Sequence, residues 1–289
     1  MLYEGMVYRP PSESNSLIIQ VSLGCSYNAC SFCSMYKGKT FRIRTFEEIN
    51  NDLLIARKKN KSVKRIFLAD GDAMVLKTDF LSLILDRIKI LFPECERVGL
   101  YGTPRSILSK GGNDLDVLRS KGLGIVYIGV ESGSDKVLQS MNKGVSSKDL
   151  VEAGRLVKHT GIKLSTMIIS GLGGHLLKQE HANESAHVIN QMNPDYLSLL
   201  TLMVEPETTL FEQVIKGEFK LLSVSDIMVE TRHFIEQLDL SACLFRSNHA
   251  SNYLAIGGKL PENKQNLLKV IDEAILQKTP FRNPYNRTL

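Results

Sequence analysis

Three cysteines within nine residues constrain this chain more than any other feature of its sequence. Cys25, Cys30 and Cys33 are separated by four and then two residues, in the segment GCSYNACSFCSMYKGKTFR. A zinc site usually adds a fourth Cys or a nearby His, and neither occurs in the forty residues that follow. Three thiolates instead leave one iron of a [4Fe–4S] cluster without a protein ligand, free to bind a small molecule. The alternatives are a chance cluster and a zinc site completed by a remote His, such as His175 or His249.

The bulk composition is that of an ordinary globular protein, with 43% hydrophobic and 23% charged residues. No apolar run reaches the roughly 18 residues that span a bilayer, and the N-terminal segment lacks a signal-peptide core. We therefore expect a cytoplasmic protein without membrane contact. A formal charge of +5 mildly favours anionic partners. Five cysteines in such a chain argue against a disulfide scaffold, and the isolated Cys95 and Cys243 are expected to be buried thiols.

Short apolar runs alternate with helical stretches, which predicts an α/β fold built on a parallel sheet. The predicted strands are Leu17–Leu23, Arg65–Ala69, Arg97–Tyr101, Ile125–Val130, Lys163–Ile169 and Tyr196–Met203. The predicted helices between them are Thr45–Lys59, Asp79–Phe92, Asn113–Lys121, Ser147–Thr160 and Lys178–Met192. Six strands and five helices suit a partial (β/α)6 barrel, and an open doubly wound sheet is the main competitor.

The rhythm changes after about residue 204. Residues 207–217, 223–238 and 261–277 look helical, and Ala242–Phe245 suits a short strand. The chain shows no internal repeat and no obvious linker. We therefore predict a single domain over residues 1–289, with a core barrel at about 15–205 and a short C-terminal extension at about 206–289.

The cysteine segment resembles the signature of the radical S-adenosylmethionine (SAM) superfamily. That signature has an aromatic residue just before its last cysteine, and Phe32 occupies this position. Its usual gaps are three and then two residues, so the first gap here is longer by one. The resemblance implies an enzyme whose three cysteines hold a [4Fe–4S] cluster. The free iron would then chelate SAM, and reductive cleavage of SAM would give a 5′-deoxyadenosyl radical that abstracts a substrate hydrogen.

Further motifs stand at predicted strand ends, where α/β barrels gather their active sites. They include Ala69-Asp70-Gly71-Asp72, the segment from Gly129 to Gly133, and the glycine-rich run after Ile169. Taken alone, each of these features has a structural explanation that involves no ligand. The explanations are an Asp-Gly turn, a helix cap at Glu131 and a surface arginine at Arg155. In their shared order they are similar to the family's SAM contacts. The resemblance implies SAM binding by Phe32, Asp70, Gly71, Asp72, Glu131, Ser132, Arg155, Ile169 and Gly171.

Substrate contacts are predicted at other strand ends and in a polar run within the tail. The run from Phe245 to Tyr253 is rich in directional donors and acceptors, which suits a substrate-binding lid. A satisfied polar loop, with His249 bonded to backbone, is the alternative. The predicted substrate residues are Tyr101, Arg105, Glu205, Arg246, Asn248, His249 and Asn252, and no catalytic residue is assigned.

The chain has no downstream CxxC pairs and no added RNA-binding region, which favours a small-molecule substrate and disfavours stable nucleic-acid binding. In size and motif style it resembles the radical SAM lyases of queuosine salvage. That resemblance implies release of queuine from queuosine 5′-phosphate, with Asp72 or Glu205 holding the base, and an electron donor such as flavodoxin or ferredoxin. A porphyrin decarboxylase-like enzyme, a tRNA-modifying enzyme, or a haem or cluster carrier without turnover are the alternatives.

Overall fold

All six predicted strands are present in the computed structural model, which describes residues 3–276 and 280–288. The chain divides into two compact units. The first comprises Met1–Asn28, Met35–Ile128 and Leu156–Leu164, and the second comprises Ala29–Ser34, Gly129–Arg155 and Ser165–Leu289. The α/β fold class predicted from the sequence is confirmed. The prediction of one domain stays a prediction.

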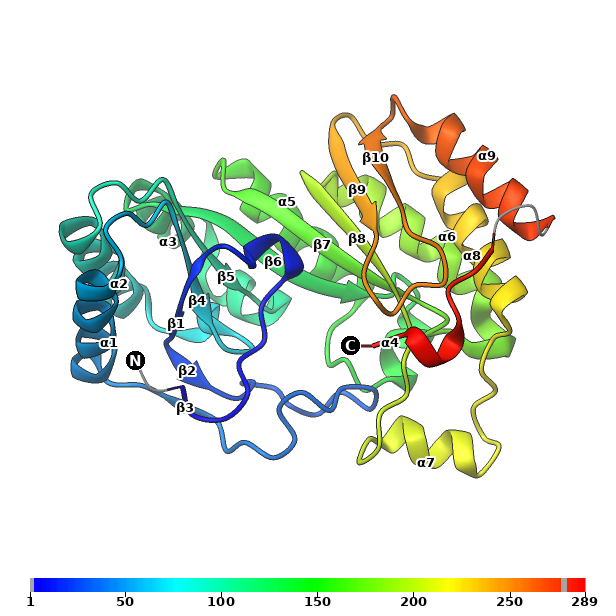
Figure 1. Cartoon of the computed structure of the whole chain (residues 1–289), viewed down its shortest axis with the longest axis horizontal. Helices are drawn as coiled ribbons and strands as arrows, with labels where there is room; N and C mark the ends of the chain where they lie inside the picture. Colours follow the sequence, from blue (N-terminus) through cyan, green and yellow to red (C-terminus); the bar gives the residue numbers. More distant parts are fainter. Residues whose placement is uncertain (1–2, 277–279, 289) are drawn as a thin grey trace. The chain divides into compact units, whose positions relative to one another are not determined.

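The first unit is built on parallel strands with helices packed outside them (Figure 1). These strands are β1 (Leu17–Gln20), β4 (Arg65–Ala69), β5 (Arg97–Tyr101) and the first part of β6 (Leu123–Glu131). The helices are α1 (Phe46–Lys59), α2 (Thr78–Leu91) and α3 (Pro104–Ser120). Short 3-10 turns η1 (Pro11–Glu13) and η2 (Ala73–Val75), and a ribbon of β2 (Ser22–Leu23) and β3 (Arg42–Ile43), complete it.

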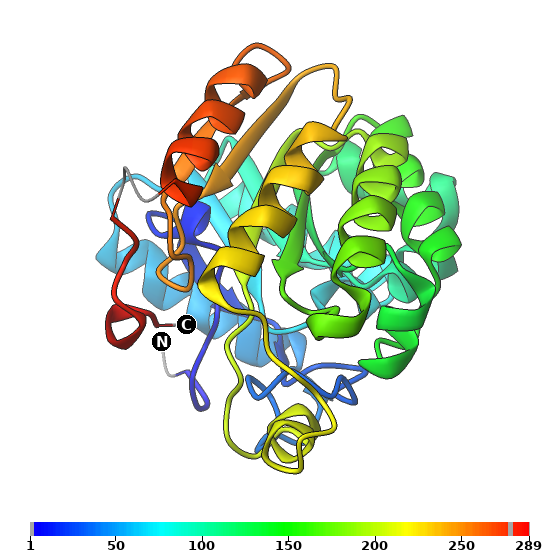
Figure 2. The ribbon, with the colours of Figure 1, turned by 90° about the vertical axis from the view of Figure 1, so that its right-hand side faces the viewer.

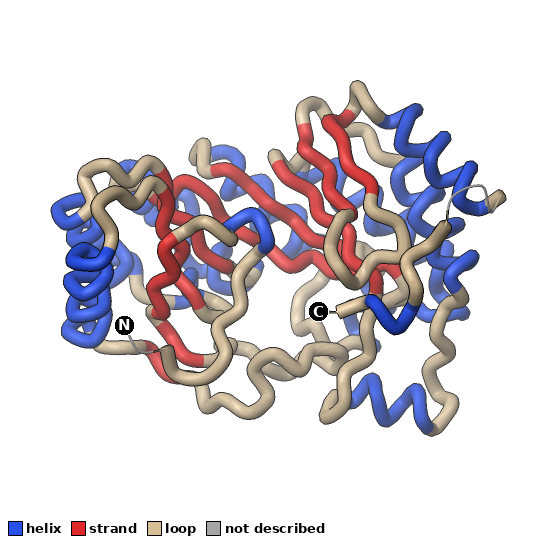
Figure 3. The backbone as a smooth tube through the Cα atoms, in the orientation of Figure 1, coloured by secondary structure: helices blue, strands red, loops and turns tan. Residues whose placement is uncertain are grey.

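The second unit has a sheet in which β7, β8 and β9 are parallel and β10 is antiparallel to β9. These strands are β7 (Lys163–Ser170), β8 (Tyr196–Thr201), β9 (Cys243–Ser247) and β10 (Ile256–Leu260). Figure 2 shows α6 (Gly174–Met192), α8 (Val224–Glu236) and α9 (Lys264–Ile275) side by side, and Figure 3 shows helices flanking the strands. The other helical segments are α4 (Asp135–Ser140), α5 (Ser147–His159), whose last residues join the first unit, α7 (Thr209–Ile215) and η3 (Pro284–Asn286).

Local sequence explains where several of these elements begin. Thr45 caps α1 because its hydroxyl accepts a hydrogen bond from the Glu48 N–H. The Glu48 carboxylate in turn accepts a hydrogen bond from the Thr45 N–H. This capping box satisfies backbone donors that have no partner inside the helix. Thr103 and Ser106 form the same arrangement at α3. α3 therefore begins at Pro104 and breaks at Gly111, where the backbone is not helical (φ 72°, ψ 178°), so the helix predicted from Asn113 is the part of α3 after this break.

The tail differs from the sequence-based prediction in one further respect. The predicted strand Ala242–Phe245 is observed as β9 from Cys243 to Ser247, and β10 was not predicted. β10 has the sequence IGGKL, whose two glycines weaken the strand pattern. Residues after 206 thus add two strands to the sheet of the second unit. Over the described residues, no helix is long and apolar enough to cross a membrane.

Candidate functional site

Asp70 follows β4 and is fully buried in the first unit. Its Oδ2 accepts hydrogen bonds from Gln20 Nε2 (3.1 Å), the Gly24 N–H (3.1 Å) and Lys39 Nζ (3.2 Å). Its Oδ1 is buried without a hydrogen-bond partner among the described residues. A buried carboxylate oxygen left unpaired is costly, so this atom is a candidate to receive a donor from a ligand.

Asp72 is also fully buried, but its hydrogen-bonding capacity is used within the protein. Its oxygens accept bonds from Ser26 Oγ (2.7 Å), from the Thr103 N–H and hydroxyl (3.2 and 3.0 Å), and from Ser106 Oγ (2.8 Å). Burial raises the pKa of Asp72 although these hydrogen bonds favour its charged form. Asp72 therefore anchors the start of α3, which leaves Asp70 better placed than Asp72 to meet a ligand.

Gly71 lies directly against the first cysteine. A Cβ on Gly71 would stand 2.9 Å from the Cys25 Cβ and 2.9 Å from a ring carbon of Tyr36. The Gly71 N–H also donates to the Gly24 carbonyl (3.1 Å). The glycine is thus required for close packing on the cysteine segment, whereas the sequence had suggested an approach to the ligand itself.

The two substrate candidates after β5 have different surroundings. Tyr101 packs edge-on against Phe67 and Tyr127, with ring centroids 5.1 and 6.1 Å away. The Arg105 guanidinium lies over the Tyr27 ring at 5.4 Å. Since Tyr27 is two residues after Cys25, Arg105 is placed near the cysteine segment, while Tyr101 belongs to an aromatic cluster of the first unit.

Cys25 belongs to the first unit, and Cys30 and Cys33 belong to the second. All three are half-buried, and none of them forms a disulfide. Within the second unit, the Ser31 N–H donates to the Met141 carbonyl and the Leu210 N–H donates to the Ser31 carbonyl, both at 2.9 Å. These bonds fix the backbone between the last two cysteines. Over the described ranges, no three His, Cys, Asp or Glu side chains assemble as a metal site, so the cluster ligands stay a prediction.

Glu131 ends β6 with a left-handed backbone (φ 65°) and is buried. Its Oε1 pairs with Lys143 Nζ at 3.1 Å, and its Oε2 is buried without a partner in the part of the chain that the structure describes. Positive φ is uncommon outside glycine and is found disproportionately at functional sites. Strain and an unpaired oxygen together mark Glu131 as a ligand-facing residue.

Lys143 was not predicted from the sequence, yet it forms an ion pair with Glu131, a predicted site residue. Besides Glu131, it lies over the Phe32 ring at 6.0 Å, and its side chain is only 15% exposed. Burial alone would lower the pKa of Lys143, but attraction to Glu131 and to the thiols of Cys30 and Cys33 outweighs burial and raises it. A charged lysine is therefore held beside two of the three cysteines.

Arg155, by contrast, lies on the surface of α5. Its guanidinium donates to the Gln191 carbonyl (3.2 Å) and to Gln191 Oε1 (3.1 Å) on α6. It is exposed. This is the surface role weighed as the alternative for Arg155, and nothing in these contacts directs it toward a ligand.

Ser132, Ile169 and Gly171 are joined to the outer helices. Ser132 Oγ is 2.8 Å from His181 Nδ1, and the Ile169 carbonyl accepts from His181 Nε2 (3.1 Å). The Gly171 N–H donates to Glu230 Oε1 (2.7 Å). Ile169 and Phe32 also pack on the same small apolar cluster of the second unit. The loops after β6 and β7 therefore lie in one unit, but the Ser132 hydroxyl is already occupied.

Many polar groups in the run from Phe245 to Tyr253 form hydrogen bonds within the protein. Asn252 is buried, accepts from Thr201 Oγ1 (2.9 Å) and donates to the Leu199 carbonyl (2.8 Å). His249 Nδ1 lies 2.9 Å from Ser251 Oγ, and burial, followed by the charge of Arg282, lowers the pKa of His249. These contacts match the alternative of a satisfied loop. The exposed candidates are Arg246 and Asn248, and Glu205 is half-exposed.

Two arginines near the C-terminus hold this run from outside. Arg282 donates to the carbonyls of His249 (3.1 Å), Ala250 (2.8 Å) and Asn252 (3.1 Å). Arg287 donates to the Leu202 carbonyl (3.0 Å) and stacks 4.1 Å from the centroid of the Tyr253 ring. Neither arginine could be predicted, because nothing in the local pattern around them points to residues 30 to 85 positions away.

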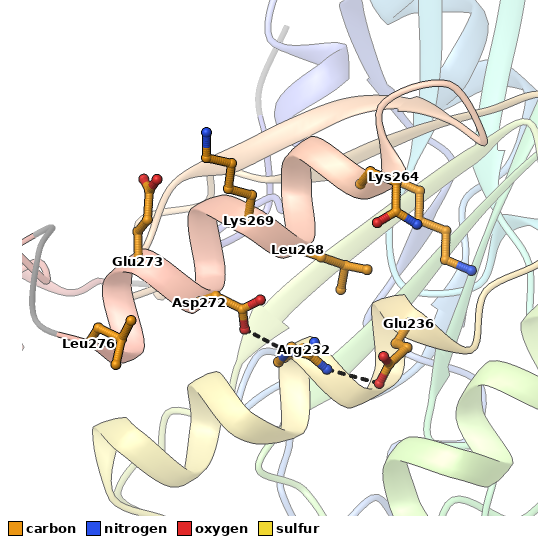
Figure 4. Close-up of a pocket in the computed structure, with 9 residues that line it drawn as sticks. Arg232, Glu236, Lys264, Leu268, Lys269, Asp272, Glu273 and Leu276 are labelled. Atoms are coloured by element: carbon orange, nitrogen blue, oxygen red, sulfur yellow. Dashed lines mark hydrogen bonds and ion pairs between the residues drawn. The ribbon is translucent and has the colours of Figure 1, made fainter.

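A surface cavity of about 380 Å³ lies between α8 and α9 (Figure 4). Its Arg232 is paired with Asp272 (2.6 Å) and with Glu236 (2.9 Å). No residue that lines it was predicted as a site residue. Since Arg232 is paired with these two carboxylates and no predicted site residue is present, this cavity is a groove between two helices and is not our candidate site.

Parallel strands followed by buried carboxylates, and thiols beside a mostly buried lysine, suit an iron–sulfur enzyme of the α/β barrel class. Residues 19–184, more than half of the chain, match the model of the radical SAM superfamily, and the chain belongs to this superfamily. Members bind a [4Fe–4S] cluster and SAM, so the predicted cofactors are confirmed. The fold is the partial (β/α)6 barrel of this family.

The curated relatives are distant and longer. A Methanocaldococcus jannaschii protein with a provisional methylthiotransferase name is 23% identical over 73% of this chain and 50% of its own length. The heme chaperone HemW of Bacillus subtilis is 22% identical over 58% of this chain and 44% of its own. The chain therefore spans about half the length of these relatives.

Solved structures show the same fold at low identity. The methyltransferase TsrM of Kitasatospora setae, with cobalamin and a [4Fe–4S] cluster bound, matches 70% of this chain and 39% of its own (TM-score 0.58, 16% identity). The Escherichia coli coproporphyrinogen III oxidase HemN, a radical SAM enzyme, matches 77% of this chain and 52% of its own (TM-score 0.55, 19% identity).

Proposed function

We propose that Cys25, Cys30 and Cys33 hold the cluster of this enzyme and that Glu131 receives the ribose hydroxyls of SAM. The observation that carries the SAM assignment is the buried Oε2 of Glu131, which has no partner among the described residues although the backbone is strained to place it. A carboxylate suits two vicinal hydroxyls because it accepts both hydrogen bonds. When bound, the cluster and SAM supply the radical that abstracts a substrate hydrogen.

Two further charged groups fit the methionyl end of SAM. Asp70 Oδ1 is buried and unpaired within the described residues, which suits the SAM ammonium. Lys143 is a mostly buried cation beside Cys30 and Cys33, which suits the SAM carboxylate. We assign the carboxylate to Lys143 in preference to Arg155, because Arg155 is exposed and bonded to Gln191.

The remaining predicted contacts divide into two groups. Phe32, Ile169 and Gly171 offer apolar surface and backbone, which suits an adenine ring. Gly71, Asp72 and Ser132 are engaged inside the protein and act by holding the site in place. The cluster requires an electron donor, and a small redox protein such as flavodoxin or ferredoxin fits this role.

For the substrate, we propose a small molecule, and as the specific reaction the release of queuine from queuosine 5′-phosphate. The support is indirect: the resemblance in size and motif style, and a charge of +5 that suits a phosphate. Because Asp72 is fully hydrogen-bonded, Glu205 is the carboxylate that we assign to the base. Arg105, placed near the cysteine segment, is our first candidate for the phosphate.

Anaerobic incubation with SAM, a reductant and queuosine 5′-phosphate tests this reaction. The expected products are free queuine and 5′-deoxyadenosine in equal amounts. If 5′-deoxyadenosine forms without queuine, the lyase assignment is wrong and the SAM site stands. The methylthiotransferase and the heme chaperone among the relatives favour two other outcomes, a methylthiolated product or tight haem binding, and either one would replace the lyase assignment.

A further inference from the structure

Glu230 of α8 reaches the back of the loop that follows β7. It is buried, and its Oε1 accepts from both the Gly171 N–H and the Ser170 hydroxyl, each at 2.7 Å. Bonds to a charged acceptor are stronger than neutral ones. The contact is close, since a Cβ on Gly171 would stand 2.8 Å from Ile227 Cδ1 of the same helix. The backbone at Gly171, which has φ 86°, is thus fixed by α8.

His181 of α6 holds the ends of two strands, β6 and β7, by hydrogen bonds. Its ring is 1% exposed. The Ile169 carbonyl can only accept, so Nε2 carries the hydrogen and donates to it (3.1 Å). Nδ1 is then the acceptor for the Ser132 hydroxyl (2.8 Å), and this hydroxyl accepts in turn from the Ser134 N–H (3.1 Å). His181 therefore connects the residue after Glu131 to the backbone of Ile169.

Glu230 and His181 also line one small buried cavity, together with Ser170 and Ser185. Its volume is about 10 Å³, close to the least that holds one water molecule. Glu230 Oε2, unpaired over the described residues, is the group there that needs a partner. The space behind the two loops is therefore almost closed, and it is lined by polar and apolar side chains together.

We propose that Glu230 and His181 are positioning residues for the adenosine half of SAM. This inference rests on the proposed function, which places the ribose at Glu131 and the adenine at Ile169 and Gly171. Neither residue touches SAM. Each fixes a backbone segment that contacts SAM, so the conformational entropy of that segment is lost before the ligand binds. The methionyl half, at Asp70 and Lys143, does not depend on them.

The test compares variants of the cluster-loaded protein under anaerobic conditions. Glu230→Leu and His181→Phe keep the size and remove the hydrogen bonds, whereas Glu230→Gln and His181→Gln keep an acceptor or a donor at the same place. Binding is measured for three ligands. SAM carries both halves, 5′-methylthioadenosine carries the adenosine half, and L-methionine carries the methionyl half. Iron content and melting temperature are measured for every variant.

We expect Glu230→Leu and His181→Phe to weaken SAM and 5′-methylthioadenosine about tenfold or more, with L-methionine unchanged. The two Gln variants should recover most of the loss. A merely structural role would lower the melting temperature and weaken all three ligands together, and this result would overturn the inference. Unchanged binding of all three ligands would overturn it as well.

The inference and the proposed function fail in different ways. If the wild-type protein binds L-methionine but neither SAM nor 5′-methylthioadenosine, the proposed SAM site is wrong. If the wild-type protein binds SAM and the variants bind it equally, only the positioning roles are wrong. Should Glu230→Leu fail to retain iron, Glu230→Asp gives the same comparison, because it withdraws the carboxylate from Gly171 with little change in polarity.

Discussion

Gly71 shows how a single residue can carry more constraint than its motif suggests. An Asp-Gly pair alone predicts a turn, and the structure shows both this turn at Gly71 and Asp72 and a close approach of Gly71 to Cys25 and Tyr36. Gly38 in the same segment provides the matched comparison, since a Cβ there would meet no atom within 4 Å. The two glycines differ in their surroundings and not in their chemistry.

Gly71→Ala should therefore displace the cysteine segment. We expect it to cost about 1–3 kcal/mol in free energy of unfolding, as overpacking does, and to lower the iron content after reconstitution. Gly38→Ala should change neither quantity. Chemical denaturation and iron analysis measure both. Equal iron content in the two variants would show that the packing of Gly71 on Cys25 does not matter for the cluster.

The cation for SAM is a second question at the level of one residue. Arg155 could be singled out from the sequence as an arginine near the motifs, but the sequence does not show that α5 turns it outward to Gln191. Lys143 follows Glu131 by twelve residues in an unremarkable loop, and only the fold brings its Nζ within 3.1 Å of Glu131.

Lys143→Met should weaken SAM binding about tenfold or more, because it removes a mostly buried charge partner. Lys143→Arg should retain most of the affinity, and Arg155→Met should leave it unchanged because Arg155 is exposed. Equilibrium binding of SAM to the cluster-loaded variants provides the measurement. A larger loss in Arg155→Met than in Lys143→Met would reverse our assignment.

At the scale of elements, the parallel core was predictable and its additions were not. β4 and β5 match the prediction residue for residue because continuous apolar runs mark buried parallel strands. α3 begins earlier than predicted because Thr103 caps it while also binding Asp72. The polar run after β9 suggested a lid, but packing against Thr201 and Leu199 makes Asn252 a structural residue.

The contact between α6 and α8 includes an ion pair with a testable pH dependence. Lys178 Nζ lies 2.5 Å from Asp226 Oδ1, and this lysine, with Ser223, lowers the pKa of Asp226 to about 2. A lowered pKa means that the stabilisation is complete above the unfolded value and is lost as pH falls toward the folded value.

Asp226→Asn should therefore lower the free energy of unfolding at pH 7 by less than about 1 kcal/mol, since both partners are about one-third exposed. The difference from the wild type should shrink as pH falls from about 4 toward about 2. Urea denaturation at several pH values measures it. A difference that grows on acidification would contradict the ion-pair explanation.

For the whole molecule, the sequence was sufficient for the fold class, the family and its cofactors. Cysteine spacing and the order of motifs are local signals, so they can be read from this sequence without any knowledge of the packing. The roles of His181 and Glu230 were not predictable, because they depend on how α6 and α8 pack on the sheet. Substrate identity depends on side chains that no local motif singles out, which is why the sequence does not predict it.

The most direct test of the account is the electron paramagnetic resonance spectrum of the reduced protein with and without SAM. We expect a [4Fe–4S] signal that changes when SAM is added, in the wild type and in Cys95→Ala, a control outside the trio. Replacing Cys25, Cys30 or Cys33 with Ala should abolish the signal or its response to SAM. A wild-type cluster signal that SAM leaves unchanged, or full response in a trio variant, would contradict the proposed cluster and SAM site.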